Sequence, residues 1–117
     1  MTSLGKLFTG TFYINDYQKE CLKTSIYPEE VGIVYPALGL AGEAGEVADK
    51  VKKILRDGVD SPEYREKIML ELGDVLWYAA VLANDLGYTL EEVALQNLKK
   101  LRSRQERGTL QGAGDDR

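Results

Sequence analysis

Residues 39–53 read GLAGEAGEVADKVKK and residues 71–78 read ELGDVLWY, and these two stretches decide the fold of the chain. Around the first stretch, apolar residues recur at spacings of three and four, at Leu40, Ala44, Val47, Val51 and Ile54. These spacings are the period of an α-helix with one buried face. They predict a helix over residues 37–57, and Gly58 is its stop signal.

Start and stop signals predict a helix on either side of this one. Asn15 and Asp16 are both good N-cap residues for a helix that runs to about Ser25. Residues 61–62, Ser-Pro, begin a helix that ends at Gly87, because proline is favoured at the first helical position.

The last helix is predicted to begin at Thr89, which forms a capping box with Glu92, and to continue to about Arg107. Residues 108–117, GTLQGAGDDR, have the glycine content of a loop or a mobile tail, and residues 1–14 form an N-terminal extension. No strand pattern of comparable quality and no internal repeat accompanies the helices. The sequence therefore predicts a single all-α domain over residues 1–117, built as a four-helix bundle.

Composition limits the classes of partner. The chain has 15 basic and 19 acidic residues and a net charge of −4, which argues against binding to a nucleic-acid polymer. Cys21 is the single cysteine, so an internal disulfide is excluded and a reducing cytoplasm is expected. The first residues lack the apolar stretch of a signal peptide, and no apolar run has membrane length, so no membrane partner is expected. A chain of 117 residues encloses no deep cavity unaided, which favours self-association.

The absence of histidine is more restrictive than the charge. It excludes Ser-His-Asp and Cys-His catalysis and the usual zinc sites. Any chemistry must therefore depend on carboxylates, lysine, tyrosine or a metal-bound water.

Four carboxylates occupy matched positions in the two deciding stretches. Glu43 and Glu46 are three residues apart on one predicted helix, and Glu71 and Asp74 are three apart on the next, so each pair shares a helix face. At about 100° per residue, both pairs lie roughly 300° and 240° around from the apolar stripe of their own helix. If the two stripes face each other, all four acids line one edge of the contact.

The helix that carries Asp74 is apolar nearly all round, since this residue is the single charge between Glu71 and Asn84. Such a helix is expected to be buried on most sides, where an unpaired Asp74 would cost several kcal/mol. A cation that takes oxygen ligands, Mg²⁺ or Mn²⁺, would neutralise the acids. The alternative for Glu43 and Glu46 is a solvated helix face with partners such as Lys50. A di-iron carboxylate site would normally require histidines, which the chain lacks.

At these residues the chain resembles the MazG-like nucleoside triphosphate pyrophosphohydrolases of the all-α NTP pyrophosphatase superfamily. The resemblance rests on Glu-x-x-Glu followed by Glu-x-x-Asp, here with 24 residues between Glu46 and Glu71, and extends from YQKE at residues 17–20 through the last helix. It implies Mg²⁺-dependent cleavage of a nucleoside triphosphate to the monophosphate and pyrophosphate. It also implies that Glu43, Glu46, Glu71 and Asp74 are the metal ligands.

The resemblance further implies a homodimer or a homotetramer whose active sites are completed between subunits. Trp77 and Val81, on a second apolar face, fit such an assembly, and the alternative is that they pack inside one subunit. The glycines beside the acids, Gly42, Gly45 and Gly73, would be explained by a close approach of the helices at the metal site. Metal would neutralise the phosphates and acidify an attacking water, with Glu43 or Glu46 as the general base.

Supporting residues are predicted on three helices. Asn97, Lys100 and Arg104 share a helix face, and their resemblance to the family pattern suggests that they grip the phosphates; the alternative is a solvated basic face. Lys53 is a further candidate for binding the phosphates. Tyr78, one turn beyond Asp74, is a candidate for stacking on the base or hydrogen-bonding the substrate. The tail resembles the ends of some relatives, which suggests that it closes over substrate.

Three functions follow from these residues. The first is nucleotide pyrophosphohydrolase in nucleotide-pool housecleaning, with Mg²⁺ as cofactor and Mn²⁺ as its substitute. The second is a catalytically silent helical interaction module. The third is a metal-dependent phosphoesterase that acts on another nucleotide, such as a nucleoside diphosphate or an alarmone.

Overall fold

A computed structural model describes residues 7–117, and this part of the chain contains four α-helices, one short 3₁₀ helix and no strand. The elements are α1 (Ile14–Lys23), η2 (Glu29–Val31), α2 (Val34–Asp57), α3 (Pro62–Asp85) and α4 (Leu90–Glu106). The all-α prediction is confirmed, and the predicted helices are all present with ends shifted by up to three residues.

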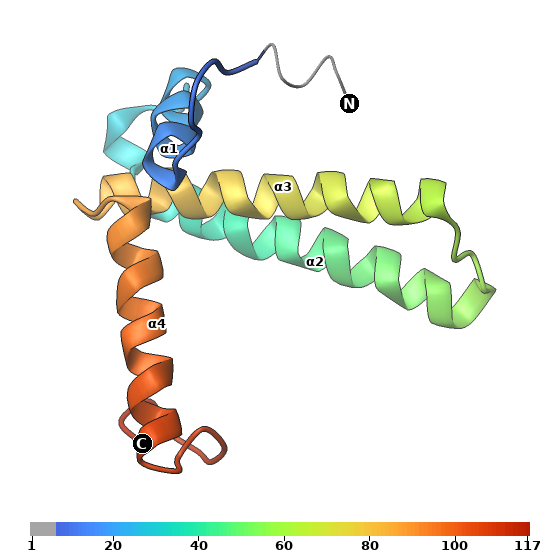
Figure 1. Cartoon of the computed structure of the whole chain (residues 1–117). Helices are drawn as coiled ribbons and strands as arrows, with labels where there is room; N and C mark the ends of the chain where they lie inside the picture. Colours follow the sequence, from blue (N-terminus) through green and yellow to red (C-terminus); the bar gives the residue numbers. More distant parts are fainter. Residues whose placement is uncertain (1–6) are drawn as a thin grey trace.

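Helices α2 and α3 form an antiparallel hairpin, and they make the most extensive helix contact of the fold (Figure 1). Gly58 ends α2 in the left-handed conformation with φ +68°, which glycine adopts without a steric cost. Ser61 then caps α3, because its side chain accepts a hydrogen bond from the amide of Tyr64. The Tyr64 hydroxyl donates back to the carbonyl of Lys50, at 2.9 Å, and joins the two helices near their connected ends.

Helix α2 begins at Val34, three residues before the predicted start. Pro36 lies in its first turn, where backbone N–H groups have no acceptor inside the helix, so the N–H that proline lacks costs no hydrogen bond. The residue before the helix, Ile33, has φ +68°, which is costly for a β-branched side chain. Asp85 at the end of α3 holds this strained segment: its Oδ2 accepts from the Ile33 amide at 3.2 Å and from the Tyr27 hydroxyl at 2.6 Å.

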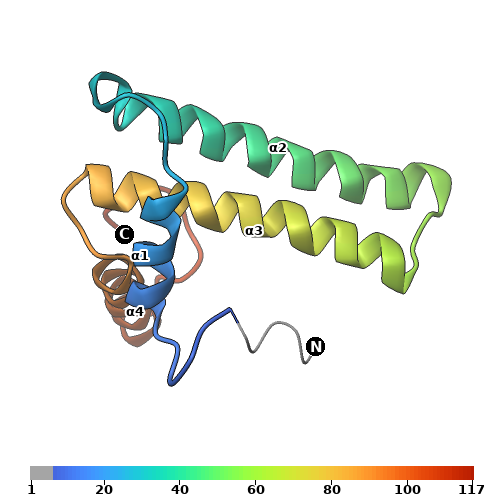
Figure 2. The same cartoon turned by 90° about the horizontal axis from the view of Figure 1, so that it is seen from above.

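The buried core lies where α1 and α4 meet the C-terminal half of α3 (Figure 2). Its buried members are Cys21, Ala80, Val81 and Leu90, and four partly buried aromatic residues surround them: Tyr17, Tyr27, Trp77 and Tyr78. Trp77 and Val81 thus pack inside one subunit, which was the alternative to a role in assembly.

Gln18 of α1 is buried in this core and ties three elements together. Its amide nitrogen donates to the carbonyls of Ala80, at 3.0 Å, and Tyr88, at 3.2 Å, while its oxygen accepts from the amide of Leu90 at 3.0 Å. The last bond satisfies one of the free N–H groups at the start of α4. One polar side chain therefore fixes how α1, α3 and α4 join.

Helix α4 runs away from the hairpin instead of lying along it, so one chain does not close a four-helix bundle (Figure 1). The radius of gyration is 17.1 Å, against about 13 Å for a compact domain of this length. The expectation that α3 is buried on most sides is wrong for its first half within a single chain, where Met69, Leu70 and Leu72 are more than half exposed. None of the helices within residues 7–117 is both long and apolar enough to cross a membrane.

Candidate metal and phosphate site

Three of the four predicted carboxylates meet across the hairpin. Glu43 of α2 and Glu71 and Asp74 of α3 each offer an oxygen atom, and these atoms all lie within 4.8 Å of one another. Glu43 and Glu71 are partly buried where the two helices meet, whereas Ala44 and Val51 of the predicted apolar stripe of α2 are exposed. The stripes therefore do not face each other along their full length, and the glutamates lie on the contact itself. Glu43, Glu71 and Asp74 are called the carboxylate cluster below.

Glu46 and Asp74 depart from the expected arrangement. Glu46 is exposed on α2 and its carboxylate is not part of the cluster, although it is close enough to act electrostatically on Glu43. Asp74 is exposed, so the argument that its burial demands a cation is wrong for the isolated chain. What favours a cation at this place is the negative charge that the three acids bring together.

The pKa of Glu43 reflects its surroundings in the cluster. The pKa of the Glu43 carboxyl is raised above its ordinary value, first by desolvation and then by the negative charges of Asp74, Glu71 and Glu46 and a hydrogen bond with Glu71. One positive group lies against the cluster: Lys50 Nζ is 3.6 Å from Glu71 Oε1, and both side chains are about one quarter exposed. It is the single salt bridge of residues 7–117 that involves a cluster member.

The donor set of the cluster fits a hard divalent cation. All the ligand atoms on offer are carboxylate oxygens, which Mg²⁺ and Mn²⁺ prefer, and the described residues offer no nitrogen or sulfur alternative at this edge. Octahedral Mg²⁺ binds oxygens at about 2.1 Å and usually retains several waters, so three carboxylates are a sufficient protein contribution.

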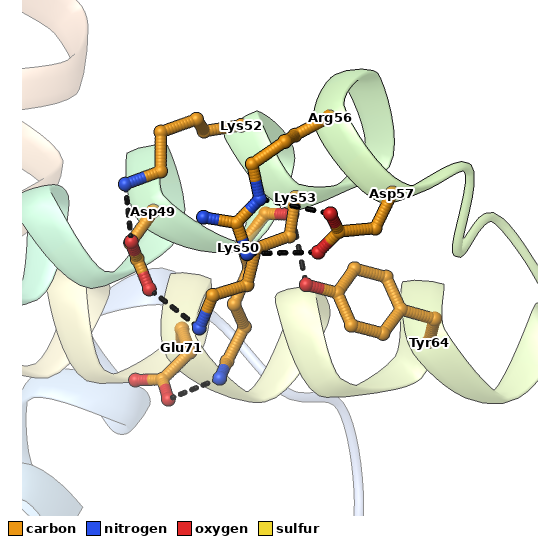
Figure 3. A network of polar contacts seen from close by, with 8 residues as sticks. All are labelled: Asp49, Lys50, Lys52, Lys53, Arg56, Asp57, Tyr64 and Glu71. Atoms are coloured by element: carbon orange, nitrogen blue, oxygen red, sulfur yellow. Dashed lines mark hydrogen bonds and ion pairs between the residues drawn. The ribbon is translucent and has the colours of Figure 1, made fainter.

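The basic residues beyond the cluster on α2 are mostly paired with acids of their own helix (Figure 3). Lys52 and Lys53 both contact Asp49, at 2.9 and 3.0 Å, and Arg56 contacts Asp57 at 2.8 Å. The predicted phosphate ligand Lys53 is therefore engaged away from the cluster. Lys50, proposed from sequence only as a partner for acids of its own helix, instead reaches across to α3.

Tyr78 lies beside the cluster, as its place one turn after Asp74 predicts. Its ring packs on Gly39 of α2, where a β-carbon would overlap the ring atoms. Burial raises the pKa of the Tyr78 hydroxyl, and the neighbouring Tyr35 and the charges of Glu43 and Asp74 raise it further. The glycines beside the acids behave differently: a β-carbon on Gly42, Gly45 or Gly73 would meet nothing within 4 Å, so close approach within the chain does not explain them.

Asn97 and Lys100 line a hollow along α4, with a volume of about 980 Å³. Its lining residues are Tyr88, Glu92, Val93, Gln96, Asn97 and Lys100. None of the cluster residues lines this hollow. The helix that carries it, α4, runs away from the α2–α3 hairpin (Figure 1).

Arg104 does not join this hollow. It is only 6% exposed, and its Nη2 donates to the carbonyl of Asp115 at 2.7 Å. Residues 108–117 fold back over it, and the guanidinium of Arg117 holds their turns by donating to the carbonyls of Thr109, Leu110 and Gly114. The structure thus shows Arg104 as an anchor for the C-terminal segment.

Comparison of the sequence with known proteins identifies its family. Residues 36–109 match the MazG nucleotide pyrophosphohydrolase domain, a range that includes all four acids. The chain is also similar to the Gene 37 protein of Mycobacterium phage L5, with 49% identity over 113 residues that cover 90% of this chain and 99% of the phage protein. No solved structure matches it. The matched domain spans more than half of the chain and contains the carboxylate cluster, and the chain therefore belongs to the MazG nucleotide pyrophosphohydrolase family.

Proposed function

We propose that this protein is a Mg²⁺-dependent nucleoside triphosphate pyrophosphohydrolase that removes surplus or non-standard nucleotides. Water adds across the bond between the α- and β-phosphates of a ribo- or deoxyribonucleoside triphosphate, and the products are the nucleoside monophosphate and pyrophosphate. The observation that carries the proposal is the meeting of Glu43, Glu71 and Asp74 across the α2–α3 hairpin within the MazG match.

Each acid has a definite part in the proposed reaction. Glu43, Glu71 and Asp74 would hold Mg²⁺, or Mn²⁺ in its place, and Glu46 would join them by a rotation of its exposed side chain. The bound ion supplies charge neutralisation for the phosphates and lowers the pKa of an attacking water.

A proton must leave the attacking water, and two carboxylates are candidates for the general base. Glu46 is outside the cluster of three, and if it stays outside the ligand set of the cation, its oxygens are free to accept a proton. Glu43 has a raised pKa in the metal-free protein, so its carboxylate would be a stronger base than an ordinary glutamate only in a state in which it does not ligate the cation. A variant of the base would lose turnover but keep its metal affinity, whereas a variant of a ligand would lose both.

We further propose that the working enzyme is a homodimer or a homotetramer in which a second copy completes the site. Helix α4 carries exposed leucines at residues 95, 98 and 101, and the first half of α3 exposes an apolar surface of its own. Apolar area of this extent is typical of an association surface. In such an assembly, Asn97 and Lys100 of one copy would reach the phosphates held by the cluster of another. Light scattering coupled to size-exclusion chromatography tests this directly, and a monomer would contradict it.

One assay tests the proposed reaction. The protein is incubated with a panel of ribo- and deoxyribonucleoside triphosphates and Mg²⁺, and monophosphate and pyrophosphate are measured. Equal amounts of the two products support the proposal. Release of inorganic phosphate, or turnover of diphosphates alone, would favour a different phosphoesterase, and no turnover with either metal would favour a silent interaction module.

A further inference from the structure

Within residues 7–117, the carboxylate cluster carries three acids and forms a salt bridge with one basic residue, Lys50. Its ammonium lies 3.6 Å from Glu71 Oε1, a distance that makes an ion pair but not a well-formed hydrogen bond. The ammonium therefore stands against the cluster as its counter-charge, at a distance that leaves the pair geometrically loose.

The main chain at Lys50 is fixed although its side chain is loosely held. The Tyr64 hydroxyl donates to the Lys50 carbonyl at 2.9 Å and anchors this turn of α2 to α3 (Figure 3). The ammonium is thus tethered close to the cluster while the flexible stem lets it move over a few ångströms. The other basic residues of this part of α2 are committed to Asp49 or Asp57.

Metal binding changes the partners available to Lys50. A carboxylate that ligates a divalent cation loses most of its attraction for a second cation, so Glu71 no longer neutralises the ammonium. The phosphate chain of a substrate held by the cation would then be an anion within reach of Lys50. A compact ammonium with three donors suits phosphate oxygens.

We propose that Lys50 is a phosphate-binding residue. It forms an ion pair with Glu71 in the metal-free protein and contacts the phosphate chain of the substrate when a metal ion binds Glu71. This inference rests on the proposed function and adds a residue to its substrate site. The proposal predicts that a single substitution of Lys50 strengthens metal binding and weakens phosphate binding. Loss of the ammonium removes a competitor of the metal and also removes a ligand of the phosphate.

The test compares Lys50→Met with Lys52→Met, which removes the same charge two residues further along α2 from a lysine paired with Asp49. Titration calorimetry measures Mn²⁺ binding to the free protein and then inorganic pyrophosphate binding at saturating Mg²⁺. For Lys50→Met, we expect Mn²⁺ to bind about two- to fivefold more tightly and pyrophosphate about tenfold more weakly. Lys52→Met should match the wild type in both, and Lys50→Arg should restore pyrophosphate binding.

Three outcomes overturn the proposal. The first is Mn²⁺ binding by Lys50→Met that is unchanged or weaker than in the wild type. The second is pyrophosphate binding by Lys50→Met that equals that of Lys52→Met. The third is a wild-type protein that binds no pyrophosphate. Protection of the buried Cys21 thiol from modification verifies that each variant is folded. Neither titration measures turnover, so a protein that hydrolyses no nucleotide would refute the proposed reaction while the role of Lys50 is still decided by binding.

Discussion

The ring of Tyr78 on α3 lies directly on Gly39 of α2, in the space that a β-carbon on residue 39 would occupy. This contact sets the separation of the two helices one to two turns from the carboxylate cluster. Tyr78 is close enough to Glu43 and Asp74 for their charges to raise the pKa of its hydroxyl. The spacing of the hairpin and the geometry of the acids are therefore coupled through one glycine.

Substitution of Gly39 should reduce the stability of the fold. In Gly39→Ala, the methyl group displaces Tyr78 or separates the helices, and we expect a loss of about 1–3 kcal/mol in the free energy of unfolding. Gly42→Ala is the matched control, because nothing lies within 4 Å of the added carbon and alanine favours a helix by up to about 1 kcal/mol. Urea unfolding measures the free energy of unfolding of both variants. Equal values would mean that the contact does not constrain the hairpin.

Gln18 should be among the most sensitive polar positions of the fold. Replacement by leucine leaves the carbonyls of Ala80 and Tyr88 and the amide of Leu90 without their partner. We expect a loss of about 2–4 kcal/mol in the free energy of unfolding. Asn15→Ala, which removes more exposed hydrogen bonds to Glu91, should cost about 1 kcal/mol or less. Chemical denaturation distinguishes the two, and a Gln18 variant as stable as the Asn15 variant would contradict this account of the core.

The Cys21 thiol should be unreactive in the folded protein. It is 3% exposed, and burial raises its pKa, so both access and the thiolate fraction are low. We expect a chromogenic disulfide reagent to label it only under denaturing conditions. Rapid labelling of the native protein at mildly alkaline pH would show that α1 does not stay docked on α3.

Glu71→Gln should separate metal binding from folding. Mg²⁺ at about 100-fold its Kd should stabilise the wild type by about 2.7 kcal/mol and raise its Tm. The amide is a poorer ligand and loses the Lys50 ion pair, so the variant should show little Mg²⁺-dependent rise in Tm and no turnover. Circular dichroism should report unchanged helix content. A variant that hydrolyses nucleotide at the wild-type rate would remove Glu71 from the ligand set.

The raised pKa of Glu43 predicts a specific pH dependence. The folded metal-free protein binds the Glu43 proton more tightly than the unfolded chain does, so this residue favours folding at low pH, and that contribution is lost as pH rises through the folded pKa. Glu43→Gln should therefore stabilise the metal-free protein at neutral pH, and its advantage should shrink as pH falls. Thermal unfolding over a pH series in a chelating buffer measures the difference. An advantage that is independent of pH would show that charge repulsion is not its source.

Protons should also compete with metal at this carboxylate. The Mg²⁺ affinity of the wild type should fall as pH falls through the raised pKa of Glu43, because the protonated acid is not a ligand. Calorimetry at several pH values gives this dependence directly, and an affinity that does not change with pH would exclude Glu43 as a ligand that titrates in this range.

Local sequence signals determined the helices and the pairing of the acids. Ser61 and Thr89 cap α3 and α4 as their side chains predict, and Gly58 ends α2 in the conformation that glycine favours. The acid motifs on two successive helices predicted that carboxylates from both would meet, and the structure brings Glu43 together with Glu71 and Asp74. These features depend on a few neighbouring residues and on the fixed rotation of a helix, so they are readable without a fold.

Only the tertiary structure decided how the helices meet and which residues they bring together. The direction of α4 depends on Gln18 bonding to residues more than sixty positions away, and no local pattern encodes such a contact. The same holds for Lys50, which pairs across the hairpin with Glu71, and for Arg104, which donates to the C-terminal segment. Helical periodicity gives the face on which a residue lies, but the partner opposite that face is set by long-range packing.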